Sequence, residues 1–349
     1  MSDFENNSNK NTQMYLETEN HPPLTQNPTQ QFADELDIEL RQEASIKIEN
    51  IPKRVIKAED VAFKIIHKEP HQETDINPSI AGSTKDEYIL STKDELDRLE
   101  NKFNIYESLK QLKLLGFEDG MSFVDIGIGS GKMTRMVAEY FSKSKTIIGV
   151  DINDSFLEFA KSKAKNNNLE QIEYMQGNIY KLPLKDNSVD FVWSRFVFEY
   201  LKDPLLALKE IRRVLKKGGI VAIGDLDGNC LNHYPLSEKL ENDINFIIKL
   251  LSQKGFDPFV GRKLYSYLKE TSFNQIKTFL FPYHMIAGKP NKNDLDNWSS
   301  KLLNIKKYST SSFDVSTEYI EKAIDDFLTM IKDENVFTYS TLIFAKGIK

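Results

Sequence analysis

The chain has 349 residues, 40% of them hydrophobic and 11% aromatic, and carries a formal net charge of −6. This size allows one large domain or two ordinary ones with a sizeable core, and the negative charge argues against a general affinity for nucleic acid or anionic membranes. The single cysteine, Cys230, excludes a disulfide framework and a cysteine metal cluster, so we expect no metal site.

Residues 1–85 are predicted to form an N-terminal extension. Residues 1–31 are rich in Asn, Gln and Pro and poor in branched apolar side chains, a composition typical of disorder. The short apolar patterns of residues 32–70 fit either a small ordered appendage or a flexible tail. The chain start lacks the basic and apolar regions of a signal peptide, and no run of about 18 apolar residues occurs, so we expect a cytoplasmic protein without a membrane span.

Residues 86–349 are predicted to form the main domain. A long helical pattern from Leu96 to Leu112 comes first. Strands are then predicted at 122–126, 146–150, 172–175, 189–194 and 220–226, with helices at about 132–142, 154–165 and 204–215 between them. Strands that alternate with helices pair in parallel, so we expect a doubly wound α/β sheet that binds its ligand at the carboxyl ends of the strands.

After residue 227 the pattern changes. Helices are predicted at 238–253, 265–270 and 319–332, and strands at 276–281 and 337–345. We expect the final strand to return to the sheet as its edge, which gives seven strands, most of them parallel. The region of about residues 228–335 is expected to form a helical cover over the ligand site.

A glycine turn joins the first predicted strand to its helix. Gly127, Gly129 and Gly131 follow Asp125, and glycines at such a turn allow a tight bend and close approach of a ligand. Dinucleotide-binding oxidoreductases favour the spacing G-x-G-x-x-G instead. A carboxylate at this position would repel a pyrophosphate, but it suits S-adenosylmethionine, which carries a sulfonium and an ammonium group.

Residues 86–349 resemble the class I S-adenosylmethionine-dependent methyltransferases, in the group that includes quinone-biosynthesis and other small-molecule enzymes. The motifs that carry the resemblance are Val124–Gly131, Asp151, Gly177–Ile179 with Leu182–Pro183, Ser194–Phe196 and Leu215–Gly219. The resemblance implies a Rossmann-like methyltransferase fold. It also implies S-adenosylmethionine as the cofactor and the transfer of its methyl group.

The resemblance also assigns cofactor-binding residues. Asp151 is expected to accept hydrogen bonds from both ribose hydroxyls. Asn178 stands where the family usually has an Asp that receives the adenine amino group, and its amide oxygen can still accept that bond. The remaining expected cofactor contacts are Asp125, Gly127, Ile128, Gly129, Gly131, Ile152, Ile179 and Arg195.

The acceptor is expected to be a small, partly apolar molecule, because the region after residue 227 is rich in Phe, Tyr and Leu. His233 is the candidate catalytic base and His284 a second one. Tyr88, Asp225 and Asp227 are candidate substrate contacts. Each of these five side chains also fits an ordinary structural role.

Other acceptors are disfavoured. No N-P-P-Y segment follows the fourth strand, which argues against amino methylation of bases, and one cysteine excludes the two-cysteine chemistry of pyrimidine C5. No basic stripe with interleaved aromatic residues indicates nucleic acid as a partner. A protein methyltransferase and a non-catalytic S-adenosylmethionine-binding module are the alternatives, and the oligomeric state is left open.

Overall fold

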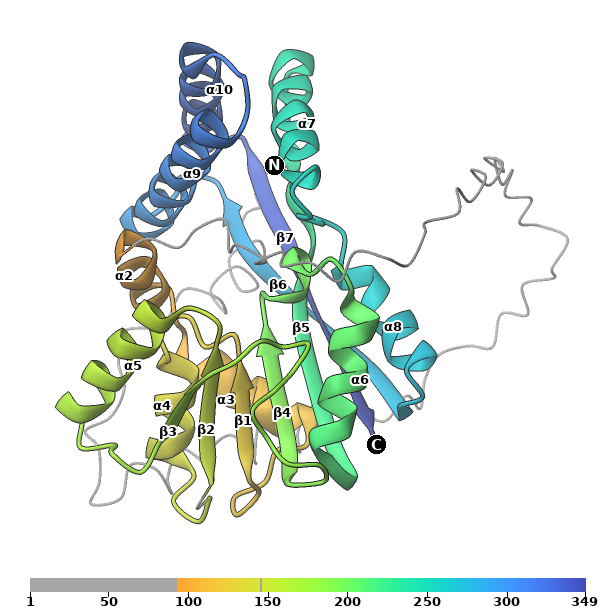
Figure 1. The fold of residues 1–349 in the computed structure, drawn as a ribbon. Helices are drawn as coiled ribbons and strands as arrows, with labels where there is room; N and C mark the ends of the chain where they lie inside the picture. The colour runs from red at the N-terminus through yellow and green to blue at the C-terminus, as the bar shows by residue number, and fades with distance from the viewer. Residues whose placement is uncertain (1–92, 145) are drawn as a thin grey trace, which may run out of the picture. The chain divides into compact units, whose positions relative to one another are not determined.

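The computed structural model describes residues 93–144 and 146–349, all within one compact unit of the chain, Gly82–Lys349. Helices and strands alternate through the first half of this region (Figure 1). The predictions for residues 1–92, which include disorder of the first segment and a role for Tyr88, concern residues outside the described range.

The described residues form one seven-stranded sheet in the order β3-β2-β1-β4-β5-β7-β6. Its strands are β1 Phe123–Ile126, β2 Ile147–Asp151, β3 Glu173–Gln176, β4 Val189–Arg195, β5 Leu215–Tyr234, β6 Asn274–Ala287 and β7 Phe337–Ile348. β1 to β5 pair in parallel, and β7 pairs antiparallel with both β5 and β6. The predicted doubly wound, mostly parallel sheet is confirmed.

The prediction that the final strand forms the sheet edge is wrong. β7 lies between β5 and β6, and β6 is the edge strand. The reason is visible in the burial of the two strands. β7 buries Leu342, Phe344 and Ala345, whereas most of β6 is exposed or half-buried. A strand that is apolar on both faces is more stable between two neighbours than at an edge.

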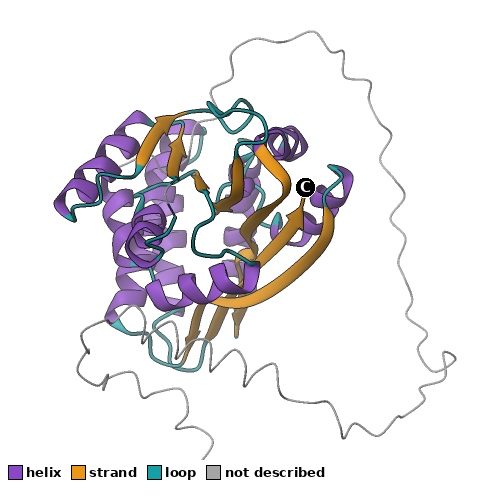
Figure 2. Ribbon diagram, turned by 90° about the horizontal axis from the view of Figure 1, so that it is seen from below, coloured by secondary structure: helices purple, strands orange, loops and turns teal. Residues whose placement is uncertain are grey.

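The described helices are α2 Lys93–Asn101, α3 Ile105–Leu115, α4 Lys132–Tyr140, α5 Asp154–Asn166, α6 Pro204–Val214, α7 Glu238–Ser252, α8 Leu264–Glu270, α9 Lys292–Ser312 and α10 Thr317–Met330. Figure 2 shows helices on both faces of the sheet. None of these described helices is both long and apolar enough to cross a membrane.

Two helical predictions need correction. The pattern from Leu96 to Leu112 belongs to two helices, because the Asn104 side chain accepts a hydrogen bond from the Glu107 N–H and so caps a new start at α3. α9 was not predicted. Its many polar residues weaken the apolar pattern, although Asn291 caps its start and Trp298 and Leu302 are buried one turn apart.

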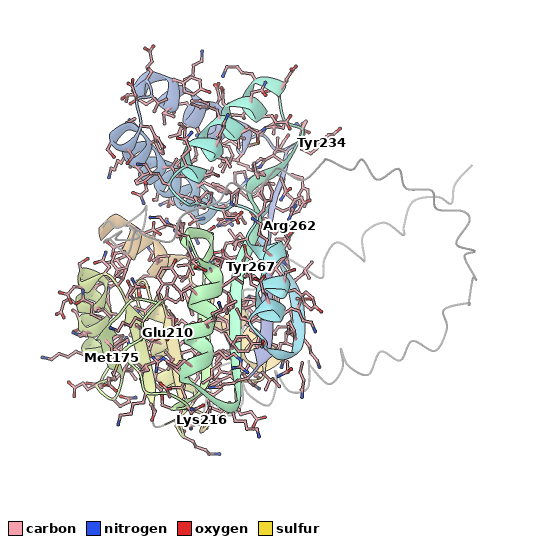
Figure 3. The ribbon with its side chains drawn as sticks, turned by 45° about the vertical axis from the view of Figure 1, so that its right-hand side comes forward. Met175, Glu210, Lys216, Tyr234, Arg262 and Tyr267 are labelled. Atoms are coloured by element: carbon pink, nitrogen blue, oxygen red, sulfur yellow. The ribbon has the colours of Figure 1, made fainter. Side chains whose placement is uncertain are left out.

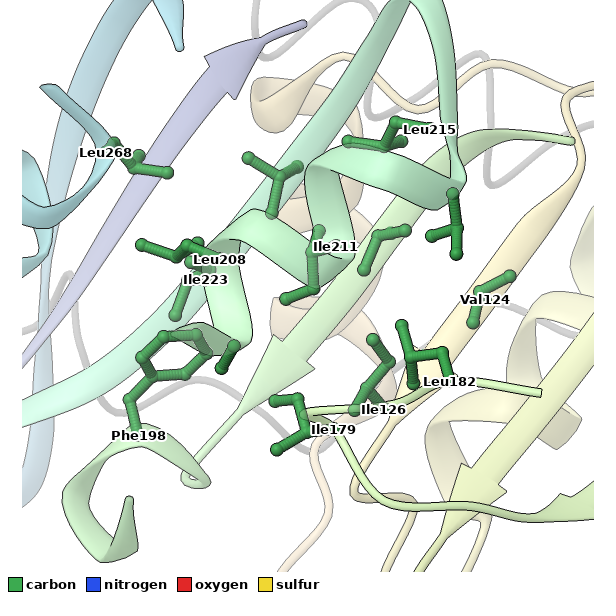
Figure 4. Packing of buried hydrophobic residues seen from close by; sticks show 14 of the residues in the cluster. Val124, Ile126, Ile179, Leu182, Phe198, Leu208, Ile211, Leu215, Ile223 and Leu268 are labelled. Atoms are coloured by element: carbon green, nitrogen blue, oxygen red, sulfur yellow. The ribbon is translucent and has the colours of Figure 1, made fainter. Parts of the chain in front are cut away.

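The main core lies between the sheet and helices α6 and α8. Its buried side chains include Val124 of β1, Ile223 of β5, Leu208 and Ile211 of α6, and Leu268 of α8 (Figure 4). Asp203 caps the start of α6 and Pro204 occupies its first turn, which fixes where this apolar helix begins. This packing holds the carboxyl ends of β1 and β4 in place.

A second cluster of buried side chains joins α7, α9 and α10. Trp298 of α9 and Phe327 of α10 lie with ring centroids 5.1 Å apart, next to Leu240 and Ile244 of α7. β5 leads to this cluster, since it continues to Tyr234, well past its predicted end at residue 226 (Figure 3). The cover predicted for residues 228–335 therefore contains these helices and also the strand β6.

Candidate active site

A cavity of about 540 Å³ lies at the carboxyl ends of β1, β2 and β4, a size typical of small-molecule sites. Nine of the ten predicted cofactor residues line it: Asp125, Gly127, Ile128, Gly129, Asp151, Ile152, Asn178, Ile179 and Arg195. The tenth, Gly131, is the N-cap residue of α4 at the end of the glycine turn and does not line the cavity. The structure thus brings the motif residues of four separate segments to one wall.

The glycine turn has a backbone that other residues do not adopt easily. Gly127 has φ +75°, and a Cβ there would lie 2.4 Å from Val197 Cγ2. Its N–H donates to the carbonyl of Val150 at 2.8 Å, which ties the turn to β2. This hydrogen bond and the close approach of Val197 fix the position of the turn at the cavity wall.

Asp151 ends β2 and is largely buried at the cavity wall. Its carboxylate accepts hydrogen bonds from the N–H groups of Gly129 at 3.2 Å and Asn153 at 2.9 Å. Burial raises the pKa of Asp151 to about 6, and the two backbone donors partly oppose this shift. The ionised group can accept the two hydroxyls of a ribose.

Asp125 lies on the neighbouring strand and is also buried. Its carboxylate accepts a 2.7 Å hydrogen bond from the Thr134 hydroxyl of α4. Burial raises the pKa of Asp125 to about 6, and the hydrogen bond and the positive charge of Arg195 oppose this shift. A buried carboxylate of this kind suits a cationic group of the ligand.

Asn178 and Arg195 complete the predicted cofactor residues. The Asn178 side-chain oxygen accepts the Tyr180 N–H at 2.9 Å, which leaves its second lone pair for an adenine amino group. The Arg195 guanidinium lies between the rings of Phe103, Trp193 and Phe196, at 5.3–5.7 Å from their centroids. Its hydrogen bonds to the Ser108 hydroxyl and to the Gln111 side-chain oxygen are long, at 3.4 Å.

Three of the predicted base and substrate residues, His233, Asp225 and Asp227, do not line this cavity. His233 lies on the extended part of β5, where its Nδ1 is 3.1 Å from the Thr338 hydroxyl. Asp225 is buried and accepts the N–H groups of Glu199 and Leu226. Asp227 forms an ion pair with Arg262.

The opposite wall of the cavity contains residues that the sequence did not single out. Lys102 and Phe103 come from the segment between α2 and α3, Tyr283 from β6, and Lys301 from α9. His284, the second candidate base, also lies there. The strand predicted at 276–281 ends before Tyr283 and His284, whereas β6 continues to Ala287, so their place at the site depends on how far β6 pairs.

The pH dependence of cofactor binding follows from the two buried carboxylates. S-adenosylhomocysteine keeps its own charges between pH 5 and 8, and it should bind the ionised forms of Asp125 and Asp151. Since their pKa values are about 6, the affinity is expected to fall about tenfold between pH 7.5 and pH 5 for each group that must be ionised.

Titration calorimetry across this range measures the effect. Asp151→Asn should flatten part of the profile, because the amide does not titrate. An affinity independent of pH in the unmodified protein would contradict the assignment of both carboxylates.

Comparison with known proteins identifies this region. Residues 124–223 match the family described as "Methyltransferase domain". Residues 124–223 therefore form a methyltransferase domain. The prediction of a methyltransferase domain is thereby confirmed.

The relatives agree with this assignment. The demethylmenaquinone methyltransferase of Lactococcus lactis subsp. lactis is 33% identical over 173 residues, which are 50% of this chain and 64% of that protein. The enzyme of the same name from Bacillus velezensis is 36% identical over 112 residues, which are 32% of this chain and 48% of that protein. The chain thus spans about half to two thirds of the length of these relatives.

Solved structures with similar folds include a putative methyltransferase from Bacillus halodurans, with a TM-score of 0.47, 18% identity, and coverage of 70% of this chain and 98% of that one. A phosphoethanolamine N-methyltransferase of Haemonchus contortus has a TM-score of 0.46, 21% identity, and coverage of 70% of this chain and 52% of that one.

Proposed function

We propose that this protein transfers a methyl group from S-adenosylmethionine to a small, partly apolar molecule. One observation carries the proposal. The cavity that begins at Asp125 and Asp151 continues, without a dividing wall, to a side lined by Phe103, Phe196 and Tyr283. A cofactor and an acceptor can therefore lie side by side in one cavity.

The residues of the domain divide between these two tasks. Asp151 holds the ribose, Asn178 the adenine amino group, and Asp125 the ammonium group of the cofactor. Arg195 lies close enough to Asp125 to affect its pKa, so it holds the cofactor carboxylate. When bound, S-adenosylmethionine supplies an electrophilic methyl group, and the aromatic side chains orient the acceptor and exclude water.

The name of the two relatives reported above supports a small-molecule acceptor. Both are called demethylmenaquinone methyltransferases. The apolar and aromatic acceptor side of the cavity is compatible with a ring-shaped molecule of that general kind. Residues 86–349 then form the catalytic domain, and residues 1–85 an extension to it. The protein acts in the cytoplasm and not on nucleic acid, in agreement with its net charge of −6.

A labelling experiment tests this function. The purified protein and S-adenosylmethionine with a labelled methyl group are incubated with a cell extract that is then separated by mass. Label is expected in the low-mass fraction. Label in proteins would support a protein methyltransferase instead, and bound S-adenosylhomocysteine without any transfer would support a non-catalytic module.

A further inference from the structure

Lys102 lines the acceptor side of the cavity, and within the described residues it forms no ion pair. It lies just after α2, and its Nζ is 5.0 Å from the centre of the Phe196 ring and 5.9 Å from that of Tyr283. Within residues 93–144 and 146–349, no ion pair or side-chain hydrogen bond of Lys102 is found. Burial lowers the pKa of Lys102, and the nearby charge of Arg98 adds to this.

The nearest buried carboxylate already has a partner. Glu95 receives two hydrogen bonds from Arg98, at 2.7 and 2.5 Å, and a third from Asn304 at 3.3 Å. Lys301 adds a further positive charge to the same side of the cavity. Glu199, which also lines the cavity, lies beside Asp225, and burial together with the charge of Glu199 raises the pKa of Asp225. The Lys102 amine is therefore available to a ligand, and an anionic ligand would favour its charged form.

His284 supplies a second unused polar group at this place. Both of its ring nitrogens are buried, and neither has a hydrogen-bond partner within the described part of the chain. Its ring lies 4.2 Å from that of Tyr283 and 5.0 Å from that of Trp298. Buried polar atoms are nearly always paired in folded proteins, so a ligand group is the natural partner here.

The backbone holds His284 in this position. Its φ is +50°, an uncommon value for a residue other than glycine, and it falls where the pairing of β6 with β7 shifts between Tyr283 and Ile286. Burial and the charges of Lys301, Lys102 and Arg98 lower the pKa of His284 well below its ordinary value. The ring is thus neutral near pH 7 and offers one donor and one acceptor.

We propose that Lys102 and His284 form a subsite for an acidic oxygen on an aromatic or otherwise apolar acceptor, such as a phenol or enol hydroxyl that binds as its anion. Lys102 neutralises the charge, His284 makes a hydrogen bond to the oxygen, and the rings of Phe196 and Tyr283 contact the apolar body. The subsite rests on the proposed function for its biological meaning. Its ligand preference can be measured without any methyl transfer.

The test uses 4-nitrophenol as the probe, because its absorption spectrum distinguishes the phenol from the phenolate. Nitrobenzene is the matched neutral compound. The full-length protein with S-adenosylhomocysteine is expected to bind 4-nitrophenol at least about tenfold more tightly than nitrobenzene, with the spectrum of the phenolate. Equal affinities, or a spectrum of the neutral phenol, would overturn the proposal.

Variants locate the effect. Lys102→Met is expected to lose most of the preference for 4-nitrophenol over nitrobenzene, and Lys102→Arg is expected to keep it. His284→Asn is expected to weaken 4-nitrophenol binding about threefold, because the shorter side chain withdraws its polar atoms from the ligand. Asn also tolerates the positive φ. Lys209→Met, on the exposed surface of α6, is the control that should change nothing. Unaltered probe binding in Lys102→Met, with thermal unfolding showing a folded protein, would overturn the subsite.

The same variants separate this proposal from the wider one. Binding of S-adenosylhomocysteine should be unchanged in Lys102→Met, because Lys102 contacts the acceptor side. Failure of the unmodified protein to bind S-adenosylhomocysteine would contradict the proposed function, while the preference for 4-nitrophenol over nitrobenzene, measured without it, would still decide the subsite.

Discussion

Replacing Asp151 with alanine is expected to weaken the binding of S-adenosylhomocysteine by about 1–3 kcal/mol, or about 5- to 150-fold. The carboxylate lies at the cavity wall, oriented by the N–H groups of Gly129 and Asn153, and it is the group placed to accept both ribose hydroxyls. Alanine removes these charge-assisted hydrogen bonds and leaves the two backbone donors without this acceptor. Titration calorimetry at pH 7.5 measures the loss.

Asp154→Ala provides the matched control. This acidic residue lies three positions further along the chain, in the exposed first turn of α5, and does not line the cavity. Its replacement should leave the affinity for S-adenosylhomocysteine unchanged. Equal affinities of Asp151→Ala and the unmodified protein would remove Asp151 from the cofactor site.

Replacing Gly131 with alanine is expected to lower the free energy of unfolding by about 2–4 kcal/mol, through two separate costs. Gly131 has φ +74°, which a side chain with a Cβ disfavours. The new Cβ would also lie 2.6 Å from the Cβ of Ala160, a fully buried residue of α5. α4 and α5 would have to move apart to accept it. Urea denaturation followed by circular dichroism measures the change.

Gly218→Ala separates the two costs. Gly218 has a similar φ of +80°, but a Cβ there would have no atom within 4 Å. Its replacement should therefore cost only the backbone share, about 1–2 kcal/mol. Losses of the same size in the two variants would show that the approach of α4 to α5 at Gly131 does not contribute.

The sequence alone was sufficient to predict that the candidate cofactor residues meet at one cavity, because they come from short segments with local signals. The glycine turn, Asp151 and Asn178 lie at or within two residues of the carboxyl end of a parallel strand, and these ends meet at one edge of the sheet. Once the alternation of strands and helices was recognised, their meeting followed without knowledge of any distant contact.

The acceptor side could not be predicted in the same way. His233 follows the predicted end of the fifth strand, which suggested a place at the cavity. However, β5 continues to Tyr234 and pairs His233 with Thr338 of β7, away from the cavity. His284 reaches the cavity through the pairing of β6 at the sheet edge. Local periodicity does not encode which strands become neighbours, and the misplaced final strand has the same cause.

The length of β5 determines which substitutions can alter the cavity without touching the proposed cofactor residues. Beyond the parallel part of the sheet, β5, β7 and β6 continue as an antiparallel ribbon that leads to α7, α9 and α10. Tyr283, His284 and Lys301 belong to this ribbon and its helices, whereas Asp125 and Asp151 belong to the parallel strands. Substitutions in the ribbon can therefore change the shape of the cavity around an acceptor without changing Asp125 or Asp151. Part of the proposed acceptor side, Tyr283 and His284, is thus carried by the edge strand β6, and the proposed cofactor carboxylates by the parallel strands.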